Sequence, residues 1–442
     1  MATKIGRTGT SSTNATKFTW SAWVKRANIG SGGMMIYNYL NGDNRAYLQF
    51  QSDDKIYYYD KDGGDIQASL TTAAVYRDCN AFYHICLIGD STDGTQGDRI
   101  QLYINGVRQS MSGTYPDASD SLGMKVHTGT NYHVLGTNSE STSNPFLGIM
   151  SHVHYVDGID YPATTFGSTD ATTGEWKINT SPSITTSDYG NNGYFVLKDG
   201  NSVTDQSGNS HNFTVTAGTL TKTEDNPSNV FATWNPLWSA SNGNVGDVAF
   251  SNGNLTTTTS SSYRTTPTTL GMKDGKFYWE IKRIEYDGND THFGVMSENA
   301  TPANTATWIG SQANGWIIAQ NGVPYNAGNY GSAIANASFE ANGAIMMGAY
   351  DGTTGKLYFG VNGTWGGTAN PSTGANPHYT LDTSLFYFPC VSTGGDVSAN
   401  FGNGYFGSTQ ISSAGTNASG IGIFEYDVPT GFTALSTKGL NL

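Results

Sequence analysis

The sequence predicts an all-β protein made of two antiparallel β-sandwich domains of the jelly-roll type, joined by an irregular connector. Three observations predict this fold class. Apolar and polar residues alternate along many short segments, which is the pattern of half-buried strands. The chain has 56 glycines, 12% aromatic residues and only 13% charged residues, a composition that favours strands and tight turns. Its 442 residues are too many for one sandwich and suit two.

Strands are expected first in the N-terminal half. In each of three segments one set of apolar residues falls on a single strand face. The sets are Phe18, Trp20, Ala22 and Val24 in segment 18–24, Tyr83, Ile85 and Leu87 in segment 83–87, and Ile100, Leu102 and Ile104 in segment 100–104. The last segment runs into Asn105-Gly106, a pair that tolerates positive φ and closes a two-residue hairpin. A further strand is expected from Leu147 to Val156.

The alternation weakens after residue 158 and returns in the C-terminal half. Segments 277–281, 345–349 and 357–361 each alternate, and the last leads into Asn362-Gly363, a second two-residue hairpin. We therefore expect a first sandwich over residues 1–165, a connector with short strands over 166–232 and a second sandwich over 233–442.

Charge and hydropathy exclude several classes of partner. The formal charge is −13, from 22 basic and 35 acidic residues, so no nucleic acid is expected as a partner. No apolar run approaches the ~20 residues of a membrane span, so no membrane insertion is expected. The N-terminal segment has no apolar core of signal-peptide length, and we expect the protein to reach an exterior by assembly or lysis.

The three cysteines, Cys79, Cys86 and Cys390, are odd in number and follow no metal or disulfide spacing. They are predicted to be buried free thiols.

The first half resembles the laminin G-like, concanavalin A-like sandwich family. The resemblance covers residues 1–165 and lies in FTWSAWVKRA, YHICLIGDSTDGTQGDRIQLYINGV and NPFLGIMSHVHYVDG. The opening KIGRTGTSSTNATKFTWSAWVKRA resembles the form that this module takes in bacteriophage virion proteins, especially those of marine phages.

The second half resembles a SPRY domain. GKFYWEIKRIEYDGNDTHFGVMSE, GWIIAQNGVPYNAG, ANGAIMMGAYDGTTGKLYFGVNGTW and FYFPCVSTGGDVSANFG occur in that family's order. Between the halves, DQSGNSHNFTVTAGTLTKTEDNPSNVFATWNPL is similar to a linker that recurs in phage structural proteins. The combination implies a virion component located on the phage particle surface.

A catalytic reading has little support in the sequence. Glu280 and Glu285 lie near the spacing of the laminarinase Glu-x-Asp-x-x-Glu motif, but Lys282 replaces the central Asp, and the pair lies in the SPRY-like half. Without a bulge the two carboxylates point to opposite faces. No nucleophile elbow or phosphate-binding loop is present, so no enzyme activity is expected.

Histidine pairs and acidic stretches are the two kinds of candidate metal ligand in the sequence. His152 and His154 lie two apart on a strand, as do His84 and Cys86, and each pair is expected to be structural because no third ligand is evident. Asp60, Asp62 and Asp65 are calcium candidates, together with Asp93 and Asp98, since some laminin G-like modules bind calcium at loop carboxylates. Ordinary hairpin turns explain these acidic stretches better, so no cofactor is expected.

Ligand binding has more support in the sequence. Proteins usually hold a saccharide with aromatic rings that stack on the sugar and with nearby amides that bond to its hydroxyls. The candidates expected in or beside loops of the second half are Trp316, Tyr325, Asn326, Tyr330 and Trp365. In the first half, Tyr57 and Tyr59 share a strand face next to Asp60. Core packing is the alternative role for each of these residues.

The resemblances leave three roles open. The first is a tail fibre or other appendage that binds a host-surface glycan or receptor through the loops at the sandwich ends. The second is a capsid-surface decoration or head fibre protein without a ligand, favoured by the lack of a coiled-coil or collagen-like shaft. The third, a glycan-cleaving tailspike, needs a carboxylate pair that the sequence does not supply. Other virion proteins and further copies of the chain are the expected partners, because sandwich edges need covering.

Overall fold

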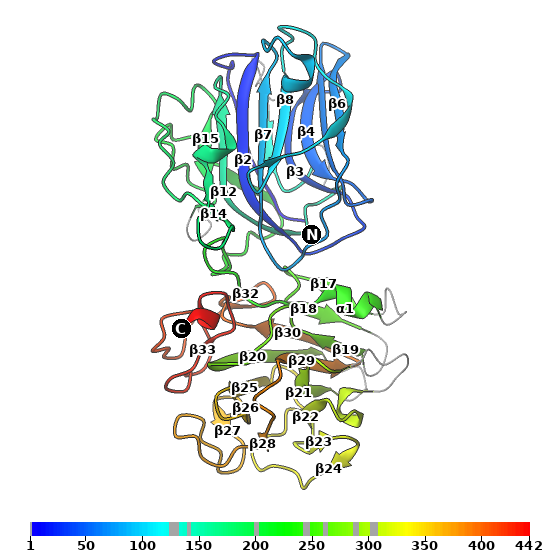
Figure 1. Cartoon of the computed structure of the whole chain (residues 1–442), viewed down its shortest axis with the longest axis vertical. Helices are drawn as coiled ribbons and strands as arrows, with labels where there is room; N and C mark the ends of the chain where they lie inside the picture. Colours follow the sequence, from blue (N-terminus) through cyan, green and yellow to red (C-terminus); the bar gives the residue numbers. More distant parts are fainter. Residues whose placement is uncertain are drawn as a thin grey trace. The chain divides into compact units, whose positions relative to one another are not determined.

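Strands dominate the computed structural model of the chain, which describes residues 2–122, 132–138, 143–198, 203–241, 248–259, 264–285, 291–300 and 308–442 (Figure 1). Two compact units divide the chain, Met1–Lys222 and Thr223–Leu442. The all-β fold class is confirmed, since antiparallel sheets build both units and the α-helix of the described residues spans only Pro236–Ser241 (α1). No helix within the described ranges is long and apolar enough to cross a membrane.

The first unit is a sandwich of two sheets, which we call sheets A and B. Sheet A has the order β10-β6-β5-β4-β3-β11-β1-β16, and sheet B the order β15-β12-β2-β7-β8-β9. The strands of sheet A are β1 (Lys4–Thr8), β3 (Gly33–Asn41), β4 (Asn44–Phe50), β5 (Ile56–Asp62), β6 (Asp65–Thr72), β10 (Met111–Thr114), β11 (Tyr132–Leu135) and β16 (Thr214–Ala217). Those of sheet B are β2 (Lys17–Arg26), β7 (Tyr83–Asp90), β8 (Ile100–Ile104), β9 (Val107–Arg108), β12 (Gly148–Asp157) and β15 (Tyr194–Val196).

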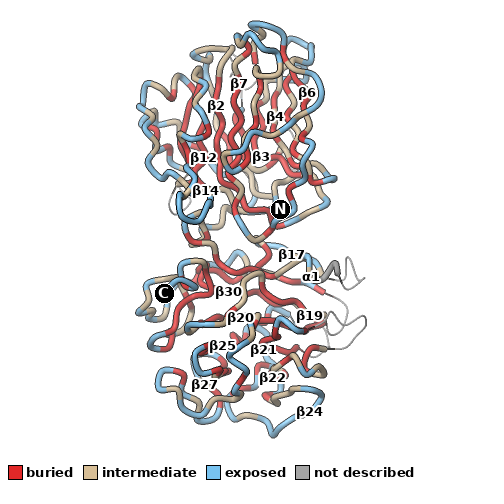
Figure 2. Tube along the Cα trace, viewed as in Figure 1, coloured by how far each residue is buried: buried red, intermediate tan, exposed pale blue. Residues whose placement is uncertain are grey.

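An apolar core fills the space between sheets A and B. Trp20 and Leu87 enter it from sheet B, and Leu48 and Leu70 enter it from sheet A. The apolar face predicted for segment 18–24 points into this core, as predicted. Figure 2 shows that buried stretches follow the strands, whereas many of the connecting loops are exposed.

The segment expected as a connector contributes strands to the first unit. β15 pairs with β12, and β16 pairs with β1 at the edge of sheet A. The hairpin of β13 (Gly167–Thr169) and β14 (Trp176–Ile178) lies within the same unit. The unit boundary therefore falls near residue 222, not at 165, because these short strands complete the sheets that the first 165 residues begin.

The second unit is also a sandwich of two sheets, which we call C and D. The strands of sheet C are β17 (Ala249–Ser251), β18 (Thr256–Thr258), β30 (Asp396–Asn400), β20 (Lys276–Glu285), β25 (Ile345–Asp351), β26 (Lys356–Val361) and β27 (Thr364–Trp365), in that order, with β28 (Tyr379–Thr380) beside β26 and β33 (Thr433–Ala434) parallel to β20. The strands of sheet D are β19 (Arg264–Pro267), β29 (Tyr387–Thr393), β21 (His292–Ser297), β22 (Gly315–Ala319), β23 (Pro324–Asn326) and β24 (Asn329–Tyr330). Short elements complete the chain: β31 (Tyr405–Phe406), β32 (Thr409–Gln410) and the 3₁₀ turns η1 (Gln96–Asp98), η2 (Ala163–Thr165), η3 (Ile309–Ser311) and η4 (Gly439–Asn441).

Both faces of sheet C are buried. The face that carries Trp279 packs into the core between sheets C and D. The other face carries Tyr278 and Met347, and the C-terminal segment 411–435 covers it with Phe424 and Phe432. The alternation over segment 345–349 therefore marks a face that lies beneath this C-terminal segment.

Both predicted Asn-Gly hairpins are confirmed. Asn105-Gly106 joins β8 to β9 with φ of 48° and 76°, and Asn362-Gly363 joins β26 to β27 with φ of 49° and 81°. Positive φ at both central residues is the geometry of the two-residue turn that matches strand twist.

Candidate functional site

A row of paired residues crosses the outer face of sheet A, the face turned away from the core. It runs from β6 through β5, β4, β3, β11 and β1 to β16. In that order its members are Ser69, Tyr59, Tyr47, Tyr37, Val134, Gly6 and Thr214. The strand neighbours Ile36, Leu48 and Tyr58 belong to the core. Because side chains alternate along a strand, the row faces outward.

Five tyrosines gather on this face, and we call Tyr37, Tyr39, Tyr47, Tyr57 and Tyr59 the tyrosine cluster. The ring centroids of Tyr37 and Tyr47 are 5.7 Å apart, and those of Tyr47 and Tyr59 are 5.1 Å apart. These rings lie within 22° of parallel, and Tyr39 stacks on Tyr37 in the same way. Tyr57 meets Tyr47 edge-on at 6.0 Å. Mutual stacking fixes the rings. Tyr37 is buried and supports its neighbours, so the preorganised surface is formed by the half-buried Tyr39, Tyr47, Tyr57 and Tyr59.

Polar groups accompany the cluster. The hydroxyls of Tyr57 and Ser69 lie 3.0 Å apart, and the Arg45 guanidinium lies 5.7 Å from the ring centre of Tyr59. Burial raises the pKa of Tyr47 to about 12, so its phenol stays neutral and can donate as well as accept a hydrogen bond. The face thus combines apolar ring surface with neutral hydroxyls.

A groove of about 720 Å³ continues the same face where β11, β1 and β16 meet. Val134 lines the groove and also packs in one apolar cluster with Tyr37, Tyr39 and Tyr47, so the groove adjoins the tyrosine cluster. The groove is lined by Lys4, Gly6, Arg7, Thr8, Tyr132, Val134, Ser210, His211, Asn212, Thr214 and Thr216. These residues come from three segments far apart in the sequence, which is why no local motif predicted the groove.

The outer face of sheet B is covered. His84 is fully buried there, stacked between Trp23 and Trp176 at centroid distances of 5.0 Å and 5.8 Å. Trp176 donates to His84 Nδ1 at 3.0 Å, and Ser21 Oγ lies 2.9 Å from Nε2. Burial lowers the pKa of His84 to about 3, so the ring is neutral. With Nδ1 accepting from an indole in place of donating to a carboxylate, this Ser-His contact lacks the orienting acid of a nucleophilic triad.

His152 and His154, like His84, are buried and contact neighbouring side chains. His152 sits at a bulge of β12 with φ of 49°, and its Nδ1 lies 2.8 Å from the Ser151 hydroxyl. His154 Nδ1 lies 2.8 Å from the Tyr189 hydroxyl, and its ring stacks on Phe195. No group of three His, Cys, Asp or Glu side chains placed to hold a metal occurs in the described part of the chain.

The aspartates considered as calcium ligands do not form one site. Asp60 is fully buried on the core side of β5 and accepts a hydrogen bond from the Tyr58 hydroxyl at 2.5 Å. Its carboxylate therefore lies on the side of β5 opposite to Tyr57 and Tyr59, a correction to the expected neighbourhood. Asp62 and Asp65 face each other across the β5–β6 hairpin, away from the core.

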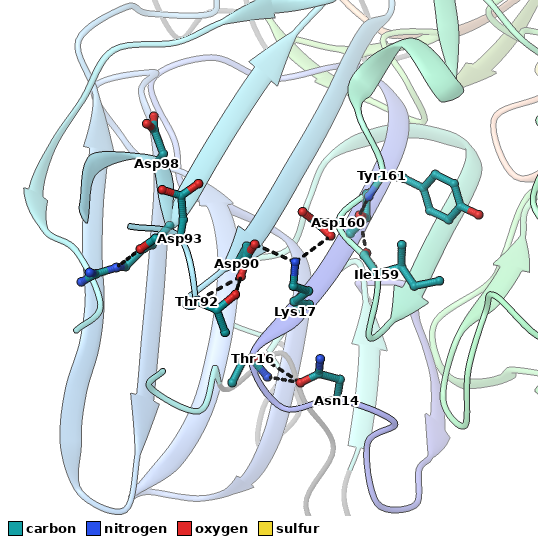
Figure 3. Close-up of polar contacts among 12 residues, drawn as sticks. Asn14, Thr16, Lys17, Asp90, Thr92, Asp93, Asp98, Ile159, Asp160 and Tyr161 are labelled. Atoms are coloured by element: carbon teal, nitrogen blue, oxygen red, sulfur yellow. Dashed lines mark hydrogen bonds and ion pairs between the residues drawn. The ribbon is translucent and has the colours of Figure 1, made fainter. Parts of the chain in front are cut away.

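The second acidic stretch is also engaged internally. Asp98 forms an ion pair with Arg108, and the Asp93 carboxylate accepts from the Thr95 amide. Figure 3 shows the Lys17 ammonium between the carboxylates of Asp90 and Asp160, at 2.7 Å and 3.2 Å. The positive charge between these two carboxylates is therefore the Lys17 ammonium.

The aromatic candidates of the second unit are dispersed. Trp316 lies within β22, not in a loop, and packs on Tyr387 at the core. Asn326 donates to the carbonyls of Ala313 and Gly315, and Trp365 packs against Tyr278. Trp316 could not be assigned because its strand β22 belongs to sheet D and turns it toward the core, and Trp365 could not be assigned because both faces of sheet C are buried.

Two of the five candidates do lie together at the edge of sheet D. The rings of Tyr325 and Tyr330 are 5.7 Å apart, and Tyr330 is 74% exposed. Trp308 meets Tyr325 edge-on at 4.7 Å and stacks on His292. Trp308 was missed in the sequence because it stands outside any alternating segment. This patch joins three aromatic side chains and His292, and none of these residues lines the groove on sheet A.

Glu280 and Glu285 are separated by burial. Glu280 is fully buried beneath the C-terminal segment 411–435, where four donors surround its carboxylate. Glu285 is exposed at the end of β20, next to a bulge. The two carboxylates therefore do not form the facing pair that glycoside hydrolysis needs.

The cysteines are buried free thiols, as predicted. Burial raises the pKa of the thiols of Cys79, Cys86 and Cys390. They are therefore protonated and unreactive near neutral pH.

Comparison with known proteins bears on the first unit. Residues 4–159 match the family model of the concanavalin A-like lectin/glucanases superfamily. The concanavalin A-like fold expected for the first half is thereby confirmed. The comparison with curated proteins found no match for the chain.

Solved structures similar to parts of the chain include SPRY domains and a pentraxin. The SPRY domain of human HERC1 is 17% identical, with a TM-score of 0.28, and 34% of this chain and 91% of that chain are covered. The TRIM65 PSpry domain is 13% identical with a TM-score of 0.29, and the coverage is 38% and 91%. A heptameric SAP-like pentraxin from Limulus polyphemus is 11% identical with a TM-score of 0.27, and the coverage is 35% and 69%.

Proposed function

We propose that the first unit binds a carbohydrate on the outer face of sheet A. The observation that carries the proposal is the groove of about 720 Å³ beside the tyrosine cluster. Binding grooves for small ligands typically measure roughly 300–1,000 Å³ and combine apolar surface with a few placed polar groups. The match of residues 4–159 to a lectin and glucanase superfamily agrees with this ligand class.

The chemistry of the cluster suits a sugar. Tyrosine supplies a rigid apolar ring with few rotamers to freeze, and its hydroxyl bonds to sugar hydroxyls. Because the rings already stack on one another, little conformational entropy is lost when a ligand is bound. In this proposal the ligand lies on a sheet face, whereas the sequence led us to expect binding at the end loops.

A glycan array probed with the full chain, followed by titration of the saccharides that bind, tests the proposal. Tyr59→Ala removes a ring that stacks on Tyr47, and we expect it to weaken binding by about tenfold, the effect of losing roughly one aromatic contact. Tyr330→Ala is the matched control, since it removes an exposed tyrosine of the second unit. Equal losses in both variants, or loss only in Tyr330→Ala, would contradict the proposal.

We further propose that the chain acts on the surface of a phage particle, as part of a tail fibre or other appendage that contacts host-surface glycan. The support is the resemblance of residues 4–27 and of residues 205–237 to phage structural proteins. The partners in this proposal are other virion proteins and further copies of the chain. Binding is proposed without catalysis, because Glu280 and Glu285 do not face each other.

Immunogold labelling of intact particles with a serum against this chain tests the location. Label at the tail supports the appendage role. Label spread over the head would favour the capsid-decoration alternative and would separate the chain from host recognition. Absence of label on every particle would contradict the virion proposal. Size-exclusion chromatography with light scattering tests the homo-oligomer, which a stable monomer that does not bind virions would contradict.

A further inference from the structure

The row of paired residues on the outer face of sheet A reaches both edges of the sheet. Thr114 of the edge strand β10 pairs with Ser69, and Thr214 lies on the opposite edge strand β16. The row therefore has one member on each strand of sheet A. Since neighbouring strands lie about 4.8 Å apart, the row is roughly 34 Å long. A monosaccharide or a disaccharide would cover only a part of it.

Tyrosines repeat along the row at the spacing of the strands. The ring centroids of Tyr37 and Tyr47 are 5.7 Å apart, and those of Tyr47 and Tyr59 are 5.1 Å apart. Because the rings stack on one another, the half-buried Tyr47 and Tyr59 present mainly their edges and hydroxyls to a ligand. A sugar unit of an extended polysaccharide advances by roughly 5 Å, close to the spacing of neighbouring strands. Successive sugar units along the row therefore meet equivalent groups.

The other end of the row is hollow because its members are small. Val134, Gly6 and Thr214 all line the groove, and Gly6 lies between the other two. The φ of Gly6 is not positive, so the backbone at this position does not require glycine. An added Cβ would lie 3.4 Å from the His133 carbonyl oxygen and 3.6 Å from Val134 Cγ2, which are ordinary contacts. A glycine inside a strand, with no conformational need for it, is typical of a place that a ligand approaches closely.

The members of the row are uncharged in a chain with a formal charge of −13. They are Thr114, Ser69, Tyr59, Tyr47, Tyr37, Val134, Gly6 and Thr214. The row thus offers hydroxyls and apolar surface, and no member that could pair with an ionic group of a ligand. These groups suit a neutral saccharide.

We propose that sheet A binds a neutral polysaccharide of extended, ribbon-like conformation through an internal stretch of its chain, which runs across the strands along this row. The tyrosines of β3, β4 and β5 hold one part of the stretch, and the groove at β11, β1 and β16 holds the next part. The row ends at two edge strands, so the polysaccharide can continue beyond the sheet on both sides. This inference rests on the proposed function of sheet A and names its substrate class.

Oligosaccharide series of increasing length test the inference with the full chain. The cello-, manno- and xylo-oligosaccharides of two, four and six units are neutral and extended, and malto-oligosaccharides of the same lengths curl into a helix. We expect the affinity for at least one extended series to rise by about tenfold or more from two to six units, measured by calorimetric titration. Malto-oligosaccharides should show no such rise, because a curled chain leaves the line of the row.

Gly6→Val tests whether the groove and the tyrosine cluster hold one chain. Its side chain would fill the floor of the groove, and we expect the hexasaccharide to lose about tenfold more affinity than the disaccharide. Gly94→Val is the matched control, because the same side chain is added where a Cβ meets open space, outside the groove. It should leave the rise in affinity with length unaltered.

A second variant covers the case in which Gly6→Val does not fold, as judged by its melting temperature. Thr214→Ile replaces a hydroxyl of the groove wall with an apolar group at an exposed position of the edge strand. It carries the same expectation, with a smaller loss for the hexasaccharide.

The outcomes separate this inference from the proposed function. Equal affinity for two and six units, an equal rise in the malto series, or equal losses for both lengths in Gly6→Val would overturn the extended site while saccharide binding stands. Binding confined to branched or terminal glycans of an array would do the same. Binding of no saccharide at all would overturn both.

Discussion

Glu280 holds the C-terminal segment 411–435 on the outer face of sheet C. Its Oε1 accepts from the Tyr426 amide at 2.8 Å and the Tyr278 hydroxyl at 2.9 Å, and its Oε2 accepts from the Glu425 amide at 2.9 Å. The Asn400 amide completes the set at 3.2 Å. A buried carboxylate that accepts four hydrogen bonds is a structural tie, which explains an acidic residue at a fully buried position of β20.

Glu280→Gln tests this tie. The amide nitrogen that replaces one oxygen would face donors, so we expect the segment to loosen by roughly 1–3 kcal/mol. Hydrogen exchange of the Glu425 and Tyr426 amides should become faster. Glu285→Gln is the control, because Glu285 is exposed, and it should leave these amides unaffected. Unchanged protection in Glu280→Gln would contradict the assignment.

The same residue predicts a pH dependence. Burial raises the pKa of Glu280 from the ordinary glutamate value of 4.5 to about 7, against the partial opposition of its donors. A raised folded-state pKa means that the folded state binds the proton more tightly than the open state. Stability from this group is therefore full below about pH 4.5 and is lost as pH rises through 7, by on the order of 3 kcal/mol.

Hydrogen exchange at Tyr426, corrected for intrinsic rates at pH 5 and pH 8, measures this dependence. The wild-type segment should open more readily at pH 8, and Glu280→Gln should remove most of the difference. A wild-type segment that is equally protected at both values would show that the carboxylate is ionised throughout.

At the scale of elements, the two Asn-Gly turns do more than reverse the chain. Asn105 Oδ1 accepts from the His84 amide at 2.8 Å, and Asn362 Oδ1 accepts from the Ile345 amide at 2.9 Å. Each asparagine therefore ties its hairpin to the next strand of the sheet. Each glycine also meets an aromatic ring, Trp176 in the first unit and Tyr426 in the second.

Gly106→Ala should destabilise the first unit by about 1–3 kcal/mol. Gly106 has φ of 76°, and an added Cβ would lie 2.4 Å from the Trp176 ring. Gly94→Ala is the control, since its Cβ would meet open space. Thermal unfolding compares the two variants, and equal melting temperatures would contradict the role of the Gly106–Trp176 contact.

Individual elements show what alternation can predict. The faces of segments 18–24 and 277–281 were correct, because the apolar set predicted for each of them enters a core. Segment 345–349 also alternates, but its Met347 face lies under the C-terminal segment 411–435, and alternation gives no sign of which side that segment covers. The stacking of Tyr37 and Tyr47 with Tyr57 and Tyr59 was also not predicted. Alternation within one strand does not show which strands are neighbours in the sheet, and these tyrosines come together because β3 pairs with β4 and β4 pairs with β5.

At the scale of the whole molecule, the chain divides into two units, with the boundary in the sequence near residue 222. β15 and β16 belong to the first unit although their segment has weak alternation. Three-residue and four-residue strands carry too few residues to show a period. The groove depends on this arrangement, because β16 supplies Thr214 and Thr216 to its wall.

Fragment 1–222 is expected to fold and to keep saccharide binding, whereas fragment 1–165 is not. Without β15, the buried Val153 and Tyr155 lose the strand that pairs with β12. Near-ultraviolet circular dichroism and thermal melting of both fragments measure this difference. Cooperative melting of fragment 1–165 at the temperature of fragment 1–222 would contradict the unit boundary.

A crystal structure of the full chain with its tightest-binding saccharide tests the central claim most directly. We predict sugar density over Tyr47 and Tyr59, on the outer face of sheet A. Density at Tyr325 and Tyr330 of the second unit, or at the loops of the first, with an empty face on sheet A, would contradict the account.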